Sequence, residues 1–255
     1  MPTIHRLDEV ASTQQVARAL LDEGAEHGTL VVARRQTAGR GRLARAWQSG
    51  EGGLWLSMVV RGSLPAARAP RLTLGAAALT LEALDVLGAH AAVKWPNDLV
   101  LPHAVPAARL GPWRKLGGVL LEAVLIEPGH LEGAVLRSAV LGLGLNVRTP
   151  PGGFAEELQD VAIALDTAGL SLDVDTVLGA LAAPLQTRLL DVIDDTVFAG
   201  TLAFLRARSA TLGMRVEVDG IAGLAERLDD EGALCVRDDG GVLHTVRAGD
   251  VQCMV

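Results

Sequence analysis

Residues 29–61 read TLVVARRQTAGRGRLARAWQSGEGGLWLSMVVR, two apolar runs joined by a segment rich in arginine and glycine. The runs at 29–35 and 54–61 have the composition of β-strands. Residues 34–45 contain five arginines and no acidic residue, although the whole chain has a formal net charge of -7. Gly39 and Gly41 alternate with Arg40 and Arg42, so the backbone can approach a ligand while guanidinium groups bind its oxygens. The stretch predicts two strands and, between them, a long loop that binds phosphate or carboxylate.

The composition is that of an ordinary globular protein. With 255 residues, of which 49% are hydrophobic and 21% charged, the chain is long enough for one sizeable core and a small second domain. The sequence pI near 5.4 argues against a general nucleic-acid binder, which would need a widespread basic face.

The cysteines and the N-terminus bear on location. Cys235 and Cys253 are too few for a disulfide framework or a CxxC metal site, which indicates a reducing, cytoplasmic compartment. The N-terminus lacks the charged and apolar regions of a leader, and no apolar run approaches the roughly 18 residues of a membrane span. We therefore expect a protein that is neither exported nor embedded in a membrane.

Periodicity predicts the elements of an α+β protein. Ser12 and Gln15 have the spacing of a capping box, which predicts a helix from Ser12 to about Gly24. A second helix is expected at about 70–87, with strands at 91–95, 99–101, 116–125 and 131–147. Residues 102–112 contain prolines and are expected to form an exposed insertion. From about 155 the pattern turns helical, and a further helix is expected at about 196–208.

Glycines punctuate short Val- and Leu-rich strands from Gly213 onward. Four or five strands in about 45 residues suggest a small barrel of the SH3 kind. We place the boundary near Ser209, which gives a first domain at 1–209 and a second at 210–255.

The strand expected at 141–147, LGLGLNV, has two different faces. A period of two places its leucines on one face and Gly142, Gly144 and Asn146 on the other. A strand that gives up two side chains loses stability, and the usual reason is close approach by a ligand or another backbone. Packing of a helix on the glycine face is the alternative.

Other polar residues have both a functional and a plain interpretation. Lys115 opens the run KLGGVLLE, where an ammonium beside glycine-thinned backbone suits a carboxylate or phosphate, although lysines at strand ends are common. Asp98, in the turn KWPND, can bind Mg²⁺ or form an Asx turn. Trp47 follows the arginine loop and can stack on a nucleotide base or pack in the core. Ser12 and Thr13 can cap a helix or offer its N-terminus to an acceptor atom.

Four motifs occur in the order QTAGRGRLARAW, KWPNDLVL, KLGGVLLE and GLGLNV, before the small β domain. Together they resemble the biotin–protein ligases, over essentially the whole chain. The resemblance implies a mixed β-sheet catalytic domain flanked by helices, similar to class II synthetases, and a C-terminal SH3-like β-barrel. It also implies a two-step reaction in which biotin and ATP give biotinyl-5'-adenylate and pyrophosphate, and a lysine of a biotin carboxyl carrier domain then takes the biotin.

The resemblance implies roles for matching residues. Ser12, Thr13 and Gln36 would meet the biotin ureido group, and Lys115 the reacting carboxylate and α-phosphate. The full biotin set would be Ser12, Thr13, Gln36, Gly39, Arg40, Gly41, Arg42, Lys115, Gly117 and Gly118. The ATP set would be Arg45, Trp47, Lys94, Asn97, Lys115 and Asn146, with Asp98 holding Mg²⁺. Lys115, Arg40 and Arg42 would be the catalytic residues.

Two features depart from the family pattern. Gln14 stands where asparagine commonly follows Ser-Thr, and the insertion at 102–114 is long. Some members begin with a DNA-binding helix-turn-helix domain, whereas this chain starts at the catalytic region. The resemblance therefore implies a monofunctional enzyme without DNA binding, and it suggests a homodimer.

Two other functions compete with this interpretation. Lipoate–protein ligases share the catalytic architecture and the adenylate chemistry, although the KWPND and GRGR motifs and the terminal barrel favour biotin. An RNA-binding or scaffold module could also combine an Arg/Gly loop with an SH3-like tail. That function predicts dispersed basic and aromatic residues on the tail, which instead contains Asp229, Asp230, Glu231, Asp238, Asp239 and Asp250.

Overall fold

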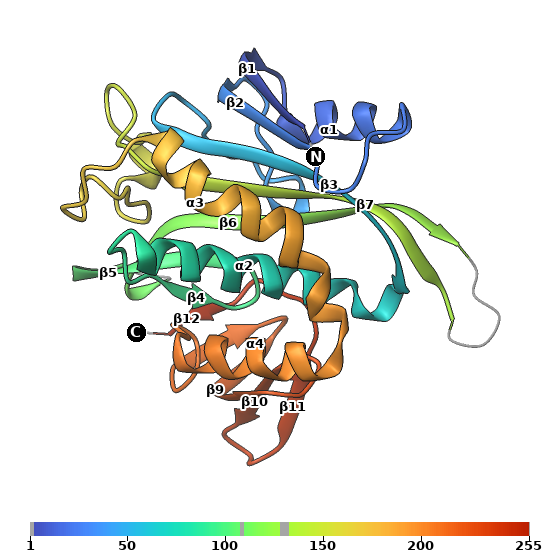
Figure 1. Cartoon of the computed structure of the whole chain (residues 1–255). Coiled ribbons are helices and arrows are strands. Elements are labelled where there is room, and N and C mark those ends of the chain that lie inside the picture. Colours follow the sequence, from blue (N-terminus) through green and yellow to red (C-terminus); the bar gives the residue numbers. More distant parts are fainter. Residues whose placement is uncertain (1–2, 108–109, 128–132, 255) are drawn as a thin grey trace.

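The computed structural model describes residues 3–107, 110–127 and 133–254, which form two β-sheets with helices beside them (Figure 1). The strands of the larger sheet are β1 (Ile4–Val10), β2 (Leu30–Gln36), β3 (Gly53–Pro65), β4 (Ala92–Lys94), β5 (Asp98–Ala107), β6 (Gly111–Glu127) and β7 (Val135–Asn146). The α-helices are α1 (Thr13–Asp22), α2 (Ala69–Val86), α3 (Val174–Arg188) and α4 (Asp195–Ala207). Short 3-10 turns are η1 (Arg42–Ala44), η2 (Ala66–Arg68), η3 (Glu156–Leu158) and η4 (Leu189–Ile193).

The larger sheet is mixed. Its seven strands have the order β1-β2-β3-β7-β6-β5-β4, and β1 pairs with β2 in parallel whereas the remaining neighbours are antiparallel. The two runs of the opening stretch become β2 and β3, which pair directly with Val32 opposite Leu56. The predicted α+β class and mixed sheet are confirmed, and the arginine loop joins two adjacent strands of that sheet.

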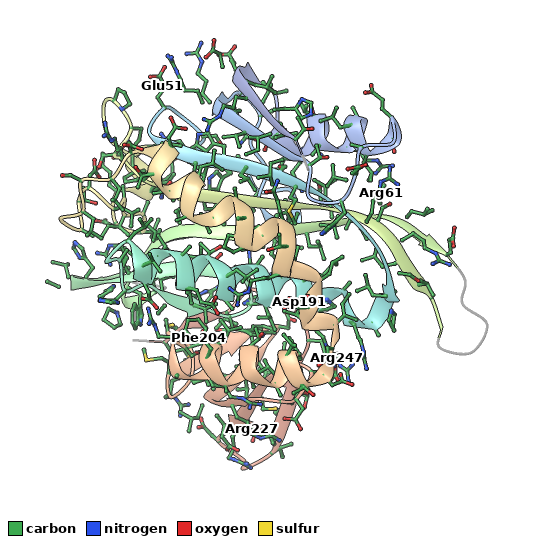
Figure 2. The ribbon with its side chains drawn as sticks, in the orientation of Figure 1. Glu51, Arg61, Asp191, Phe204, Arg227 and Arg247 are labelled. Carbon is green, nitrogen blue, oxygen red and sulfur yellow. The ribbon has the colours of Figure 1, made fainter. Side chains whose placement is uncertain are left out.

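Helices cover both faces of this sheet. Alternate side chains of β3 point to opposite sides, so that Met58 joins the core with α2 and α3 while Val59 packs with α1. Arg61, at the end of the buried part of β3, donates to the carbonyls of Leu21 and Ala25 and so satisfies the C-terminal end of α1 (Figure 2). These bonds hold the C-terminal end of α1 against β3, and the N-terminus of the helix, at Ser12 and Thr13, lies at its other end.

Residues 215–253 form the smaller sheet. Its strands are β8 (Arg215–Val218), β9 (Ile221–Leu228), β10 (Leu234–Asp238), β11 (Leu243–Val246) and β12 (Gln252–Cys253), in the antiparallel order β11-β10-β9-β8-β12. This confirms a small C-terminal β unit, with β11 and β12 as its edges. It is held to the rest of the chain by buried contacts, including the bond from Trp95 Nε1 to the Gly232 carbonyl at 2.9 Å. The boundary at 209 remains a prediction.

Several expectations about the elements were wrong. Strand β1 was not predicted, because its apolar residues Ile4, Leu7 and Val10 recur every three positions and it lies at the sheet edge. The insertion at 102–112 is largely strand, since β5 continues to Ala107 and β6 begins at Gly111. The first α-helix after 155 begins only at Val174. The expected strand at 131–147 begins in residues outside those described.

The predicted capping box does not form among the residues described. Ser12 is the N-cap of α1 and has the expected extended backbone, but its side chain makes no capping hydrogen bond. The helix prediction was right although its chemical reason was wrong. The Ser12 hydroxyl is therefore available for another partner.

One segment of the described structure meets the length and composition of a membrane span, contrary to the expectation from the sequence. Residues Val174–Ile193 are continuously helical with a mean hydropathy of 1.2. Within it Val177, Leu181 and Leu185 are fully buried in the main core, which is how α3 packs on α2 and β3 (Figure 1). The apolar character of the segment has a packing role in this fold.

Candidate active site

One cavity of about 220 Å³ lies at the ends of the central strands β3, β5, β6 and β7. The arginine loop and residues 249–251 of the C-terminal unit also line it. Most of the residues predicted for biotin, ATP or metal are in its wall: Ser12, Thr13, Gln36, Arg40, Gly41, Arg42, Arg45, Trp47, Lys94, Asn97, Asp98, Lys115, Gly118 and Asn146. The fold thus brings together motifs that are more than 100 residues apart in sequence.

The N-terminus of α1 forms a buried polar wall. Thr13 donates its backbone N–H and its hydroxyl to Gln36 Oε1, at 2.8 and 3.0 Å, and its hydroxyl also meets Ser57 Oγ at 2.8 Å. Gln36 Nε2 donates to Ser49 Oγ at 2.9 Å. These bonds tie α1 to β2 and β3 and fix the polar groups of this wall before any ligand arrives.

The arginine loop folds across the cavity to the C-terminal unit. Arg42 donates to Asn97 Oδ1 at 2.9 Å and to the Gly249 carbonyl at 3.3 Å. Arg45 donates to Asp250 Oδ2 at 2.7 Å, and this hydrogen bond lowers the pKa of the Asp250 carboxyl below its ordinary value. Leu43, between them, has φ of 54° and is 75% exposed, an unusual conformation for leucine. The loop is closed on itself by the bond from Gly41 N to the Arg45 carbonyl.

Lys115 occupies the centre of the site. Its ammonium lies 2.7 Å from Asp98 Oδ1 and 4.9 Å from the centroid of the Trp47 ring. A β-carbon at Gly118 would be 3.7 Å from Lys115 Cε, an ordinary van der Waals distance, so the lysine stem packs against this glycine without requiring it. Lys94 is buried nearby and contributes to the lowered pKa of Asp250. Arg42 and Arg45 of the arginine loop and Lys115 of β6 therefore meet at one cavity.

The glycine face of β7 is approached by side chains. A β-carbon at Gly144 would lie 2.9 Å from Trp47 Nε1, and one at Gly142 would lie 3.2 Å from the Gln14 amide. The face is not bare: Gln14 of helix α1 packs on Gly142, as the helix-packing alternative expected, and Trp47, which follows the arginine loop, packs on Gly144. Asn146, at the end of the same face, donates to the Ile163 carbonyl at 3.1 Å and positions the segment after β7.

Two predicted glycines lie outside the cavity wall as the described residues form it. A β-carbon at Gly117 would lie 2.5 Å from the Gly144 carbonyl, so this glycine permits the close pairing of β6 with β7. One at Gly39 would lie 2.3 Å from Ser49 Oγ, inside the arginine loop. Both positions have structural reasons for glycine, and their predicted contacts with biotin remain predictions.

Sequence reasoning missed part of the wall. Phe154, Leu158, Val161 and Ala162 add an apolar side from the segment after β7. The run PPGG at 150–153 could have indicated a long functional loop there. Gly249, Asp250 and Val251 come from the C-terminal unit, and no spacing pattern pointed to them.

Three buried polar atoms in the cavity wall have no hydrogen-bond partner within the part of the chain that the structure describes. They are Ser12 Oγ, Gln14 Oε1 and Trp47 Nε1. Buried polar atoms are normally paired, because leaving one unpaired costs about 1–3 kcal/mol. These atoms are consistent with a ligand that carries both donor and acceptor groups.

Residues 7–144 match the model of the Biotin/lipoate A/B protein ligase family, and residues 213–254 match the Biotin protein ligase C terminal domain. The chain belongs to the biotin protein ligase family. The bifunctional ligase/repressor BirA of Bacillus subtilis is 32% identical over 254 residues, covering 96% of this chain and 72% of that protein. The biotin–[acetyl-CoA-carboxylase] ligase of Mycobacterium tuberculosis is 33% identical over 262 residues, covering 96% and 88%.

The fold agrees with a solved family member. The biotin protein ligase from Aquifex aeolicus in complex with biotin and ATP superimposes with a TM-score of 0.77 and 26% identity, covering 99% of this chain and 98% of that one. The chain accordingly has biotin protein ligase activity, with biotin and ATP as substrates. The predicted enzyme class is confirmed over the RNA-binding or scaffold alternative.

Proposed function

We propose that this ligase adenylates biotin in the cavity described above and transfers it to a lysine of a biotin carboxyl carrier domain, as in an acetyl-CoA carboxylase. One observation carries the proposal: Arg42, Arg45 and Lys115 converge on a cavity whose α1 end is polar and buried. Each cation is paired with an acceptor of the protein itself, so anionic oxygens of a ligand can replace those partners. The Mycobacterium tuberculosis relative is a biotin–[acetyl-CoA-carboxylase] ligase, which supports the carrier assignment.

The first step brings two anions together. The biotin carboxylate oxygen attacks the α-phosphorus of ATP, a new P–O bond forms, and the bond to pyrophosphate breaks with its electron pair on the leaving oxygen. Two unit charges about 4 Å apart repel by about 4 kcal/mol at an effective dielectric of 20. Lys115, with the arginines of the loop, offsets this repulsion and stabilises the charge that develops on the leaving group.

The buried polar wall supports biotin over lipoate. A ureido ring presents two N–H donors and a carbonyl acceptor, which suit Ser12 Oγ and the other polar groups around the start of α1. A dithiolane ring has no such donors and would leave these atoms unpaired. Because a site built for hydrogen bonds discriminates strongly against an analogue that lacks them, lipoate is expected to be a poor substrate.

Mg²⁺ fits the cavity only together with the nucleotide. The described residues contain no cluster of three or more Asp, Glu, His or Cys able to hold a metal. Asp98 supplies one carboxylate, which is paired with Lys115. One carboxylate is enough for a nucleotide-bound ion, because Mg²⁺ usually binds one or two carboxylates together with substrate phosphates. Bound in that way, the ion would neutralise charge on the phosphates, and Asp98 would hold it.

The remaining assignments concern the nucleotide and the second step. Trp47 and the apolar wall from Phe154 to Ala162 offer a flat surface for adenine. The adenylate is reactive enough that the acceptor lysine needs orientation and a neutral amine, so no covalent enzyme residue is required. A homodimer and a cytoplasmic location remain proposals from the sequence.

An ATP–pyrophosphate exchange assay tests the proposal. Exchange is expected with biotin and Mg²⁺, and at least 100-fold less is expected with lipoate. A purified carrier domain should then be biotinylated on one lysine. Equal exchange with biotin and lipoate would show that the polar groups at the start of α1 do not select biotin. Absence of biotin-dependent exchange would reject adenylation in this cavity.

A further inference from the structure

Gln14 has a buried side chain with only one of its two polar ends satisfied. It is 5% exposed, lies in the first turn of α1 and lines the cavity. Its Nε2 donates to Glu122 Oε2 at 2.9 Å and reaches the Val140 carbonyl at 3.5 Å. Its Oε1 has no partner among the described residues.

The two neighbours of Nε2 decide which way the amide faces. A carboxylate and a carbonyl are both acceptors, so the NH₂ end of the amide must point to β6 and β7. A reversed amide would place Oε1 against two acceptors and would be repelled. The oxygen is consequently presented on the other side, next to the glycine face of β7, where a β-carbon at Gly142 would lie 3.2 Å from it.

We propose that Gln14 is a specificity-determining acceptor for a ureido N–H of biotin, and that Glu122 is the positioning residue that fixes its amide. The inference rests on the proposed function. Oε1 can only accept, so it selects a ligand with an N–H donor at this point. Ser12 Oγ, the other unpaired atom of the same helix start, can donate as well as accept and suits the ureido carbonyl.

The contact between Gln14 and Glu122 explains how glutamine can replace the asparagine that is common at this position. The longer side chain spans from α1 across Gly142 to Glu122 on β6, and the absence of a side chain at Gly142 leaves the space for it. Glu122 touches Gln14 and acts through it. Its removal should therefore affect recognition of the ureido ring and leave the chemistry at Lys115 unaltered.

The experiment compares biotin with the two cyclic carbamates in which one ureido N–H is replaced by oxygen. Both keep the ring size, and one of them places an acceptor against Gln14 Oε1. Wild type, Gln14→Met, Glu122→Ala and Glu122→Gln are assayed by ATP–pyrophosphate exchange for kcat and KM, with thermal midpoints as the folding control. Gln14→Met keeps the length of the side chain and removes both polar atoms.

Wild type is expected to discriminate against one carbamate by at least 10-fold in kcat/KM. Gln14→Met should raise the KM for biotin about 10-fold, keep kcat within about twofold and reduce that discrimination to within about threefold. Glu122→Ala should also raise the KM for biotin and reduce the discrimination, but by less than Gln14→Met, because the Gln14 amide is then free to turn. Glu122→Gln should be closer to wild type, since its own oxygen can accept from Gln14 Nε2.

Undiminished discrimination in Gln14→Met, or equal use of both carbamates by wild type, would overturn the inference while biotin-dependent exchange stood. If exchange with biotin were absent in wild type, the proposed function itself would fail. Should Gln14→Met or Glu122→Ala not fold, the double variant Gln14→Met with Glu122→Met removes the unpaired carboxylate and is expected to lose discrimination in the same way.

Discussion

Arg45 and Asp250, 205 residues apart in the chain, form an ion pair of 2.7 Å between the arginine loop and the segment leading into β12. Arg42 strengthens the same link by donating to the Gly249 carbonyl. The side chains of the ion pair are partly exposed, so the contact is weak enough to exchange for the anionic oxygens of a ligand. The C-terminal unit thus holds the loop over the cavity before substrate binds.

The first prediction follows from this contact. Asp250→Asn removes the charge that holds Arg45, and a partly exposed pair contributes about 0.2–1 kcal/mol. Without ligands, trypsin should therefore cleave after Arg40, Arg42 or Arg45 about two- to fivefold faster than in wild type. Biotin with ATP should suppress cleavage in both proteins, because ligand oxygens then hold the loop.

Asp239→Asn is the matched control for this proteolysis. Asp239 pairs with Arg215 within the C-terminal sheet, and the change removes one surface carboxylate without touching the loop. Cleavage of this variant should match wild type. The same cleavage rate for Asp250→Asn and wild type, or no protection by biotin with ATP, would refute the link.

The second prediction concerns Lys115. Lys115→Ala should slow single-turnover adenylation by about 100-fold or more and change the Kd for ATP by less than about fivefold, because the ammonium is needed most as charge moves to the leaving pyrophosphate. Rapid-quench measurement of biotinyl-5'-AMP gives the rate, and calorimetry gives the affinity.

Arg137→Ala serves as the control for the loss of a cation from this sheet. Arg137 pairs with Glu127 near the outer end of β6 and β7, outside the cavity wall. Its adenylation rate should equal that of wild type. Near-normal adenylation by Lys115→Ala would exclude the role given to this residue.

The sequence predicted the framework of this site because its motifs have local physical reasons. The strands flanking the arginine loop are apolar on both faces. That pattern requires both faces to be buried, and helices α2 and α3 cover one face of the sheet while α1 covers the other. Glycines at 142 and 144 indicated a close approach, and the structure supplies Gln14 and Trp47 as the groups that approach.

Long-range contacts could not be predicted in this way. Nothing in the spacing of Arg45 or Asp250 links one to the other, and Gln14 meets Glu122 only because β6 and β7 pair in one register. The helical pattern seen from 155 failed for a related reason: apolar residues such as Leu158 and Val161 face the cavity instead of a helix stripe.

The third prediction separates two glycines of the sheet. In Gly144→Ala the new methyl group would lie 2.9 Å from Trp47 Nε1, so the indole must move. We expect the KM for ATP to rise about 10-fold with a change of thermal midpoint below about 3 °C. Steady-state kinetics and a thermal melt measure both quantities.

Gly117→Ala and Gly179→Ala are the controls for Gly144→Ala, one expected to destabilise the fold and the other to stabilise it. The first brings a methyl group within 2.5 Å of the Gly144 carbonyl, which cannot move without breaking the sheet, and should lower the free energy of unfolding by more than about 2 kcal/mol. Gly179 is on α3 with open space around it, so alanine should stabilise by about 0.5–1 kcal/mol with unchanged kinetics. Unchanged ATP kinetics in Gly144→Ala would show that Trp47 has no part in binding the nucleotide.

The last prediction concerns pH and the junction of α2 with α4. Arg208 donates to both oxygens of Asp85, at 3.0 and 2.7 Å, and this lowers the pKa of the Asp85 carboxyl. A carboxyl whose pKa is lower in the folded state stabilises the fold above its unfolded pKa, and the benefit is lost as the pH falls through the folded value. Asp85→Asn should therefore lower the free energy of unfolding by about 1–2 kcal/mol at pH 7, and the deficit should shrink between about pH 5 and 3.

Urea unfolding of wild type and Asp85→Asn at several pH values checks this. Asp22→Asn is the control, because Asp22 forms an exposed i,i+4 pair with Arg18 and should change the unfolding free energy by less than about 0.5 kcal/mol at every pH. A deficit for Asp85→Asn that stayed constant from pH 7 to 3 would mean that the substitution acts through packing. A shrinking deficit would instead identify the ionised Asp85 carboxylate as the stabilising group. Arg208, which this carboxylate holds, also donates to the Ala91 carbonyl beside β4, so the ion pair fixes the start of the C-terminal unit against α2.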